Sequence, residues 1–153
     1  MKIEAEELQR IIVAHEKYLR DEPGGERANL AGINLYGCNM AGANLKGANL
    51  KGANLKRTIL WEANLEGANL EGAACKHAIM QCACLCNSCL KSAGLRGVNL
   101  IGADLRGADM SGADLDSAIL QGAVYDHGTT WPEGYDPVTS GAILSHQNSI
   151  KSI

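Results

Sequence analysis

Five of the six cysteines fall within residues 75–90, CKHAIMQCACLCNSCL, and the same segment contains His77. Thiolates and imidazoles are the ligands that zinc prefers, and neighbouring thiols can also pair as disulfides. The residue types therefore suggest a metal centre or a disulfide cluster. The register of the surrounding chain decides whether these side chains can meet.

Composition and charge exclude several classes of protein. The net charge is −3 over 153 residues, too small to indicate binding to nucleic acid or to an anionic membrane. The sequence has no apolar run long enough to span a bilayer, and the charged N-terminus does not resemble a signal peptide. We therefore expect a cytoplasmic protein with no direct nucleic-acid binding and no membrane contact, in a reducing compartment that disfavours disulfides.

A five-residue unit, A-(N/D)-L-x-G, recurs from Ala28 to His127 without insertion or deletion. Leu or Met fills its centre in 18 of 20 units, and Asn or Asp precedes this residue in 12 units. A period of five would scatter the Leu residues around a helix and alternate them across a flat strand. A corner in each unit, at the Gly that follows Leu, would keep Ala and Leu inward and the other three positions outward.

These uninterrupted units, such as ANLKGANLKGANL, resemble the pentapeptide-repeat family. The resemblance implies an all-β fold, a right-handed quadrilateral parallel β-helix of about five coils with four units per coil. Residues 28–127 would form this solenoid. Positions twenty apart would then lie directly above one another.

The flanking segments are expected to cover the open ends of the solenoid. Residues 1–27 are expected to form an N-terminal helical cap, because apolar residues from Leu8 to Leu19 recur at helical spacing before Pro23. Residues 128–153 are expected to form a C-terminal cap and tail. Trp131 and Tyr135 would belong to this cap, and the weakly structured tail would begin at residue 138.

Twenty-residue stacking predicts one outward face with an apolar stripe, which we name the isoleucine wall. It comprises Ile59, Trp61, Ile79, Ile101 and Ile119, and the three isoleucines at 59, 79 and 119 replace the Asn or Asp of the motif. Scattered single hydrophobic residues would be the structural interpretation. The shared column favours a contact surface for self-association or for a protein partner.

A second face gathers positive charge, which we name the basic patch. It comprises Lys56, Arg57, Lys76, His77 and Arg96. The structural interpretation is an ordinary solvated surface with uncompensated like charges. The functional interpretation is a contact for an acidic partner.

The same register separates the cysteines. Cys75 and Cys38 are expected to point inward, whereas Cys82, Cys84, Cys86 and Cys89 point outward on a convex surface, where side chains diverge. His77 belongs to the preceding wall. We therefore predict no metal and expect free, partly exposed thiols that are prone to oxidation, with an adventitious site at Cys82, Cys84 and Cys86 as the alternative.

No catalytic motif or phosphate-binding glycine loop is apparent, so no enzyme activity, catalytic residue or cofactor is expected. The first hypothesis for function is a structural or protein-interaction module. The alternative, implied by the resemblance, is a DNA-mimicking protein that binds DNA gyrase and protects it from quinolones. Against this alternative, the repeat array is neutral, no loop projects from it, and no apolar C-terminal helix follows.

Overall fold

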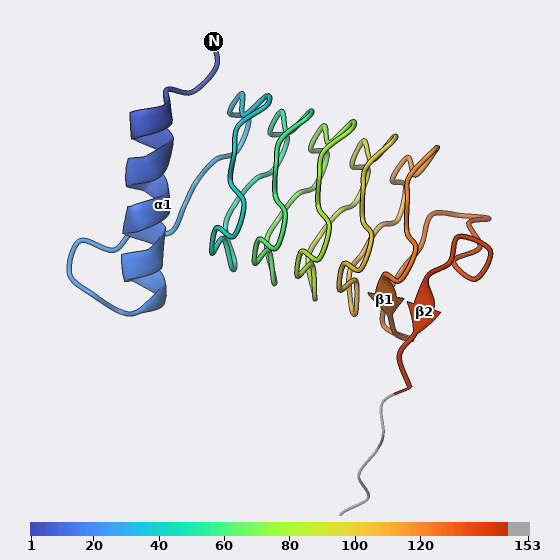
Figure 1. Cartoon of the computed structure of the whole chain (residues 1–153). Coiled ribbons are helices and arrows are strands. Elements are labelled where there is room, and N and C mark those ends of the chain that lie inside the picture. The colour runs from blue at the N-terminus through green and yellow to red at the C-terminus, as the bar shows by residue number, and fades with distance from the viewer. Residues whose placement is uncertain (147–153) are drawn as a thin grey trace, which may run out of the picture.

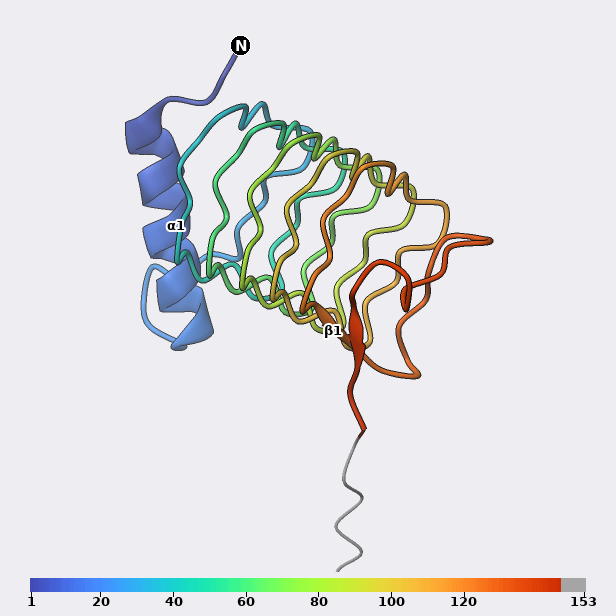
Figure 2. The same cartoon turned by 45° about the vertical axis from the view of Figure 1, so that its right-hand side comes forward.

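The computed structural model describes residues 1–146. One helix, α1 (Ala5–Leu19), lies across one end of a solenoid of stacked coils, and the C-terminal segment lies at the other end (Figures 1 and 2). Each coil turns a corner every five residues, so it has four corners and four short walls. A wall is the stack of equivalent segments between two corners.

Parallel bridges join residues twenty apart, as the sequence predicts. The column Asn39–Ile59–Ile79–Asn99–Ile119 is continuous in this way, and the other walls have equivalent columns. Because the chain turns after every five residues, only the residue before the central Leu forms a β-bridge with the equivalent residue of the neighbouring coil. The solenoid therefore consists mostly of single-residue bridges, and the named strands are β1 (Val124–Tyr125) and β2 (Ile143–Leu144).

The interior is a continuous stack of aliphatic side chains. Leu or Met at the unit centre is buried throughout the array, and the Ala two residues earlier is buried in most units. Burying one such Leu contributes roughly 1.5–3 kcal/mol, so the repeated interior drives folding. The inward positions of Cys38 and Cys75 are confirmed, since both are buried.

The expected helical cap is present over the first coil. Leu8 and Ile12 of α1 join the core, and His15 is buried between the helix and the first coil. His15 Nδ1 accepts a hydrogen bond from the Ala28 amide at 2.9 Å, so Nε2 carries the proton and donates to the Lys46 carbonyl at 2.9 Å. Burial lowers the pKa of His15, which keeps the ring neutral.

The C-terminal end is more ordered than the sequence suggested. Trp131 packs edge-on against Tyr125 and stacks on Tyr135, which places an aromatic cluster at the end of the core. The tail expected from residue 138 instead returns to the solenoid, because β2 pairs in parallel with β1. The rest of that expected tail, residues 147–153, lies outside the described residues.

Candidate functional site

The isoleucine wall lies on one side of the solenoid, as its column predicts. The backbones of Ile59 and Ile79 are bridged to each other, and Asn99 separates Ile79 from Ile119. Trp61 and Ile101 follow at the adjacent corner, whose positions are linked coil to coil by backbone hydrogen bonds. Trp61 is 47% exposed, Ile79 36% and Ile119 40%, while Ile59 and Ile101 are half-buried.

The motif Asn or Asp has a defined structural role that isoleucine cannot take. Every Asn and Asp at this position accepts a hydrogen bond through its side chain from the backbone amide two residues later. This bond, an Asx turn, fixes the entry to the corner. The amides of residues 61, 81 and 121 lack this acceptor because Ile59, Ile79 and Ile119 precede them.

The basic patch lies along the corner that immediately precedes the isoleucine wall, but its members differ in charge compensation. Arg96 contacts Asp114 at 3.2 Å and Asp116 at 3.3 Å, so its charge is neutralised. Within residues 1–146, Lys56, Arg57 and Lys76 form no ion pair. The uncompensated positive charge of the basic patch therefore lies in the second coil (residues 48–67) and the third coil (residues 68–87), beside Ile59 and Ile79.

The outward cysteines are not gathered around one point: in the part of the chain that the structure describes, no group of three or more His, Cys, Asp or Glu side chains is placed so that it could hold a metal ion. Desolvation, together with hydrogen bonding to Asp104 and Cys84, raises the pKa of Cys86 to about 12. Arg106 holds the pKa of Asp104 below its usual value, so this carboxylate stays ionised as an acceptor. A thiol that stays protonated at neutral pH is a poor nucleophile and a poor metal ligand.

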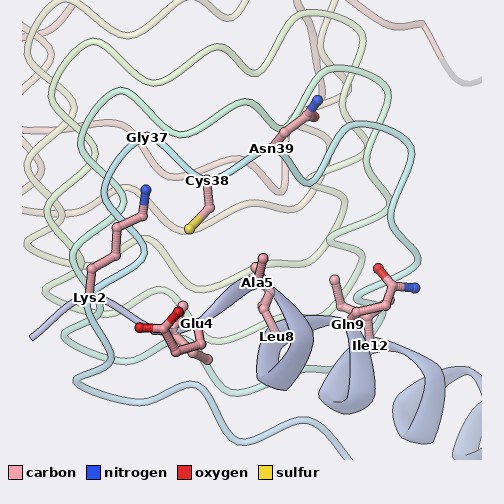
Figure 3. Close-up of a pocket in the computed structure, with 10 residues that line it drawn as sticks. Lys2, Glu4, Ala5, Leu8, Gln9, Ile12, Gly37, Cys38 and Asn39 are labelled. Carbon is pink, nitrogen blue, oxygen red and sulfur yellow. The ribbon is translucent and has the colours of Figure 1, made fainter.

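A cleft between α1 and the first coil was not predicted from the sequence. Its volume is about 500 Å³, and Figure 3 shows the Cys38 thiol pointing from the coil toward the start of the helix. Leu8 and Ile12 supply apolar surface, while Lys2 and Glu4 lie at the rim. Among residues 1–146, no histidine lines this cleft beside Cys38. Only the docking of two segments far apart in sequence creates the cleft, which is why no sequence signal indicates it.

Among residues 1–146, no helix has the length and apolar character needed to cross a membrane.

Comparison with known proteins identifies the repeat. The model of the family described as Pentapeptide repeats (8 copies) matches residues 26–61, 62–97 and 93–124. A search of curated proteins found no match.

Several solved structures are similar to this chain. HetL, a pentapeptide repeat protein involved in heterocyst differentiation regulation from the cyanobacterium Nostoc sp. strain PCC 7120, is 28% identical with a TM-score of 0.49. The alignment covers 77% of this chain and 66% of HetL, so this chain spans less than two thirds of that protein.

Rfr23 from the cyanobacterium Cyanothece 51142 is 29% identical over 64% of this chain and 90% of that one, with a TM-score of 0.41. QnrB1, a plasmid-mediated fluoroquinolone resistance protein, is 13% identical over 78% of this chain and 92% of that one, with a TM-score of 0.47. Because the family model matches more than half of the sequence, and does so where the structure forms coils, the protein belongs to the pentapeptide-repeat family.

Proposed function

We propose that the chain is a non-enzymatic, cytoplasmic protein-interaction module on a right-handed, four-sided β-helix, with the isoleucine wall as its contact surface. The observation that carries this proposal is the loss of the Asx turn at the three isoleucines. Each one gives up a hydrogen bond that all Asn and Asp units make, and each places an apolar side chain on the surface.

The energetics argue against a purely structural role for these isoleucines. A hydrogen bond of this kind contributes about 0.5–1.5 kcal/mol. Stacking between Ile59 and Ile79 recovers part of this contribution, since Ile59 is half-buried. Among the described residues, Ile119 pairs only with Asn99 and has no apolar neighbour in its column, yet it remains exposed. A partner that covers the wall would bury these apolar side chains, and their burial would offset the stability lost with the missing hydrogen bonds.

The absence of an enzyme activity is part of this proposal. Cys86 is held protonated, and the cleft beneath the first coil contributes one thiol without a neighbouring histidine. The four walls of the solenoid present side chains that diverge from convex corners. Such a surface favours contact over an area and disfavours convergence on a small substrate.

Binding to gyrase by imitation of DNA is less well supported by the surface charges. A DNA mimic needs a continuous acidic surface, but here carboxylates are matched by cations on neighbouring coils. Lys46 contacts Glu66 and Lys51 contacts Glu71, each at 3.4 Å. A supercoiling assay with and without a quinolone separates the two functions, and we expect no effect of micromolar protein.

The contact surface is tested by Trp61→Glu combined with Ile101→Glu. The matched control is Ala31→Glu with Ser111→Glu, which changes the same motif position on the opposite wall. Sedimentation equilibrium and affinity capture from native lysate should show lower mass or loss of a captured protein for the first pair only. Identical mass and capture for wild type and both pairs would rule out this surface.

A further inference from the structure

Both corners that flank the isoleucine wall depart from the glycine of the motif in the second and third coils. Arg57 (φ 56°) and His77 (φ 58°) occupy the left-handed position at the preceding corner, and Glu62 (φ 55°) and Cys82 (φ 57°) occupy it at the following corner. A non-glycine residue in this conformation costs roughly 1–2 kcal/mol. Strain that the surrounding fold must support is typical of functional positions.

The corresponding corners elsewhere in these coils are less strained. Glycine fills positions 52, 67 and 72, and Asn87, a residue type that tolerates this conformation, fills the fourth. The strained side chains are therefore concentrated on either side of Ile59 and Ile79. Three differences from the regular repeat surface therefore lie together at this place: apolar side chains on the wall, strained corners and uncompensated positive charge.

The charge distribution disfavours a second copy of the chain as the occupant. In an isologous pair across this wall, the cationic corner meets either its own symmetry mate or the corner that carries Trp61 and Glu62. Lys56, Arg57 and Lys76 of each copy would then face no carboxylate or a single one. Like charges at an interface cost several kcal/mol, so the complementary partner is acidic.

The backbone of the wall excludes addition of a strand. Ile59 donates to Cys38 and Ile79 donates to Thr58, at 2.9 and 3.0 Å, and the amides of Leu60 and Met80 donate to the next coil. These groups are already paired along the solenoid axis. A partner must therefore bind through side chains alone.

The repeat distance of the coils favours a helix. Adjacent coils are about 4.8 Å apart, the spacing of paired strands. One turn of an α-helix rises about 5.4 Å. A helix parallel to the solenoid axis would therefore bring one apolar side chain to each coil, with a mismatch of only about 2 Å over four coils. An extended strand along the axis repeats its side chains every ~6.6 Å and would lose this match within two coils.

We propose that the isoleucine wall and the basic patch together bind an acidic amphipathic helix of a partner protein, parallel to the solenoid axis. Its apolar stripe packs on Ile59, Ile79 and Ile119, and its carboxylates contact Lys56, Arg57 and Lys76. About 16 residues of helix match the height of five coils. This inference rests on the proposed function, because it specifies the partner of the same surface.

The experiment uses fluorescently labelled 16-residue peptides and measures anisotropy on the full chain. An amphipathic helix of Leu and Glu is compared with a twin that has Lys in place of Glu. A second twin keeps the acidic sequence but has two central prolines. We expect saturable binding of the first peptide, at least tenfold weaker binding of both twins, and weakening by salt.

Two variant pairs test the two halves of the surface without endangering the fold. Ile59→Asn with Ile79→Asn restores the motif at the wall, and Arg57→Gly with Lys76→Gln removes charge at the patch. Each pair should weaken the acidic helix at least tenfold. Lys51→Gln with Lys91→Gln, which removes the same number of charges from the opposite wall, should leave binding unchanged. Thermal melts followed by circular dichroism verify folding.

Several outcomes would overturn the inference. These are equal binding of the proline twin, equal binding of the basic twin, no saturable binding below about 1 mM, or equal competition by duplex DNA through the same residues. If any of these occurs while Trp61→Glu with Ile101→Glu still changes mass or capture, the proposed function stands and the helical partner fails. If that pair changes neither, the proposed function fails as well.

Discussion

The isoleucine wall and the wall opposite it share an interior but differ on the outside. The opposite wall, which we name the asparagine wall, comprises Asn29, Asn49, Asn69, Cys89 and Asp109. Its amide side chains close Asx turns, and Asn49 also donates to Asn29 at 3.2 Å. Its charges are paired, Lys51 with Glu71 and Lys91 with Asp109. The asparagine wall makes Asx turns at every position except Cys89, and the isoleucine wall leaves apolar surface and charge uncovered.

The comparison shows that the inward residues stabilise the fold, whereas the outward residues determine what each wall can contact. Leu50 behind the asparagine wall and Leu60 behind the isoleucine wall are both fully buried. The inward residues therefore give the two walls the same support. The outward residues are free to vary, and on the isoleucine wall three of five bridge positions exchange the Asx-turn acceptor for a large apolar side chain, whereas on the asparagine wall one position, Cys89, loses this acceptor.

The largest expected effect tests whether the interiors are equivalent. Leu50→Ala and Leu60→Ala should each lower the free energy of unfolding by about 2–5 kcal/mol, because each leaves a cavity in the same aliphatic stack. Urea denaturation measures both. If Leu60→Ala were far milder than Leu50→Ala, the walls would differ inside as well as outside.

The next effect comes from exchanging the residues that differ. Asn49→Ile removes the hydrogen bonds to the Lys51 amide and to Asn29 and should cost about 1–2 kcal/mol. Ile59→Asn should gain about 0.5–1 kcal/mol, because it supplies an acceptor for the Trp61 amide. Thermal melts of the two single variants should move in opposite directions. A loss of stability in both would mean that isoleucine is structurally preferred at position 59.

A smaller effect is expected at the corners of one coil. Arg57→Gly should stabilise the chain by about 0.5–1 kcal/mol, since glycine adopts φ near 56° without strain. Gly52→Arg, at the same motif position, should destabilise it by a similar amount. A stabilising Gly52→Arg would show that the left-handed corner accepts long side chains at no cost.

The smallest effect concerns the surface ion pairs of the asparagine wall. Lys51→Gln removes the contact with Glu71, but both side chains are substantially exposed, at 58% and 43%. Solvent screening limits the loss to less than about 0.5 kcal/mol, and added salt should reduce it further. A loss above about 1 kcal/mol that persists at high salt would contradict this account of the wall.

The sequence predicted the parts of the fold that depend on its period. A strict five-residue repeat places residues twenty apart in one column, and the bridges from Asn39 to Ile119 follow this register. The burial of Leu, Ala, Cys38 and Cys75 follows from the same pattern. The N-terminal helix was also predictable, because its apolar residues recur at helical spacing.

The sequence did not predict contacts that lie off the twenty-residue columns. Arg96 meets Asp114, eighteen positions later, and Lys91 reaches Asp109 in the same diagonal way. Long side chains span this offset, so Arg96 has a second carboxylate partner in addition to Asp116, which lies in its own column. The Cys86–Asp104 contact follows the same diagonal. The pairing of β2 with β1 was missed because the five-residue period stops before residue 128.

The most direct test of the account is a chain in which the isoleucine wall is rewritten to the motif by Ile59→Asn, Ile79→Asn and Ile119→Asn. Its melting temperature and its binding of the acidic amphipathic peptide are measured beside those of the wild type. We predict that melting temperature rises, through three restored Asx turns, while binding is lost. A lower melting temperature with undiminished binding would contradict the claim that these isoleucines bind a partner and lower the stability of the isolated chain.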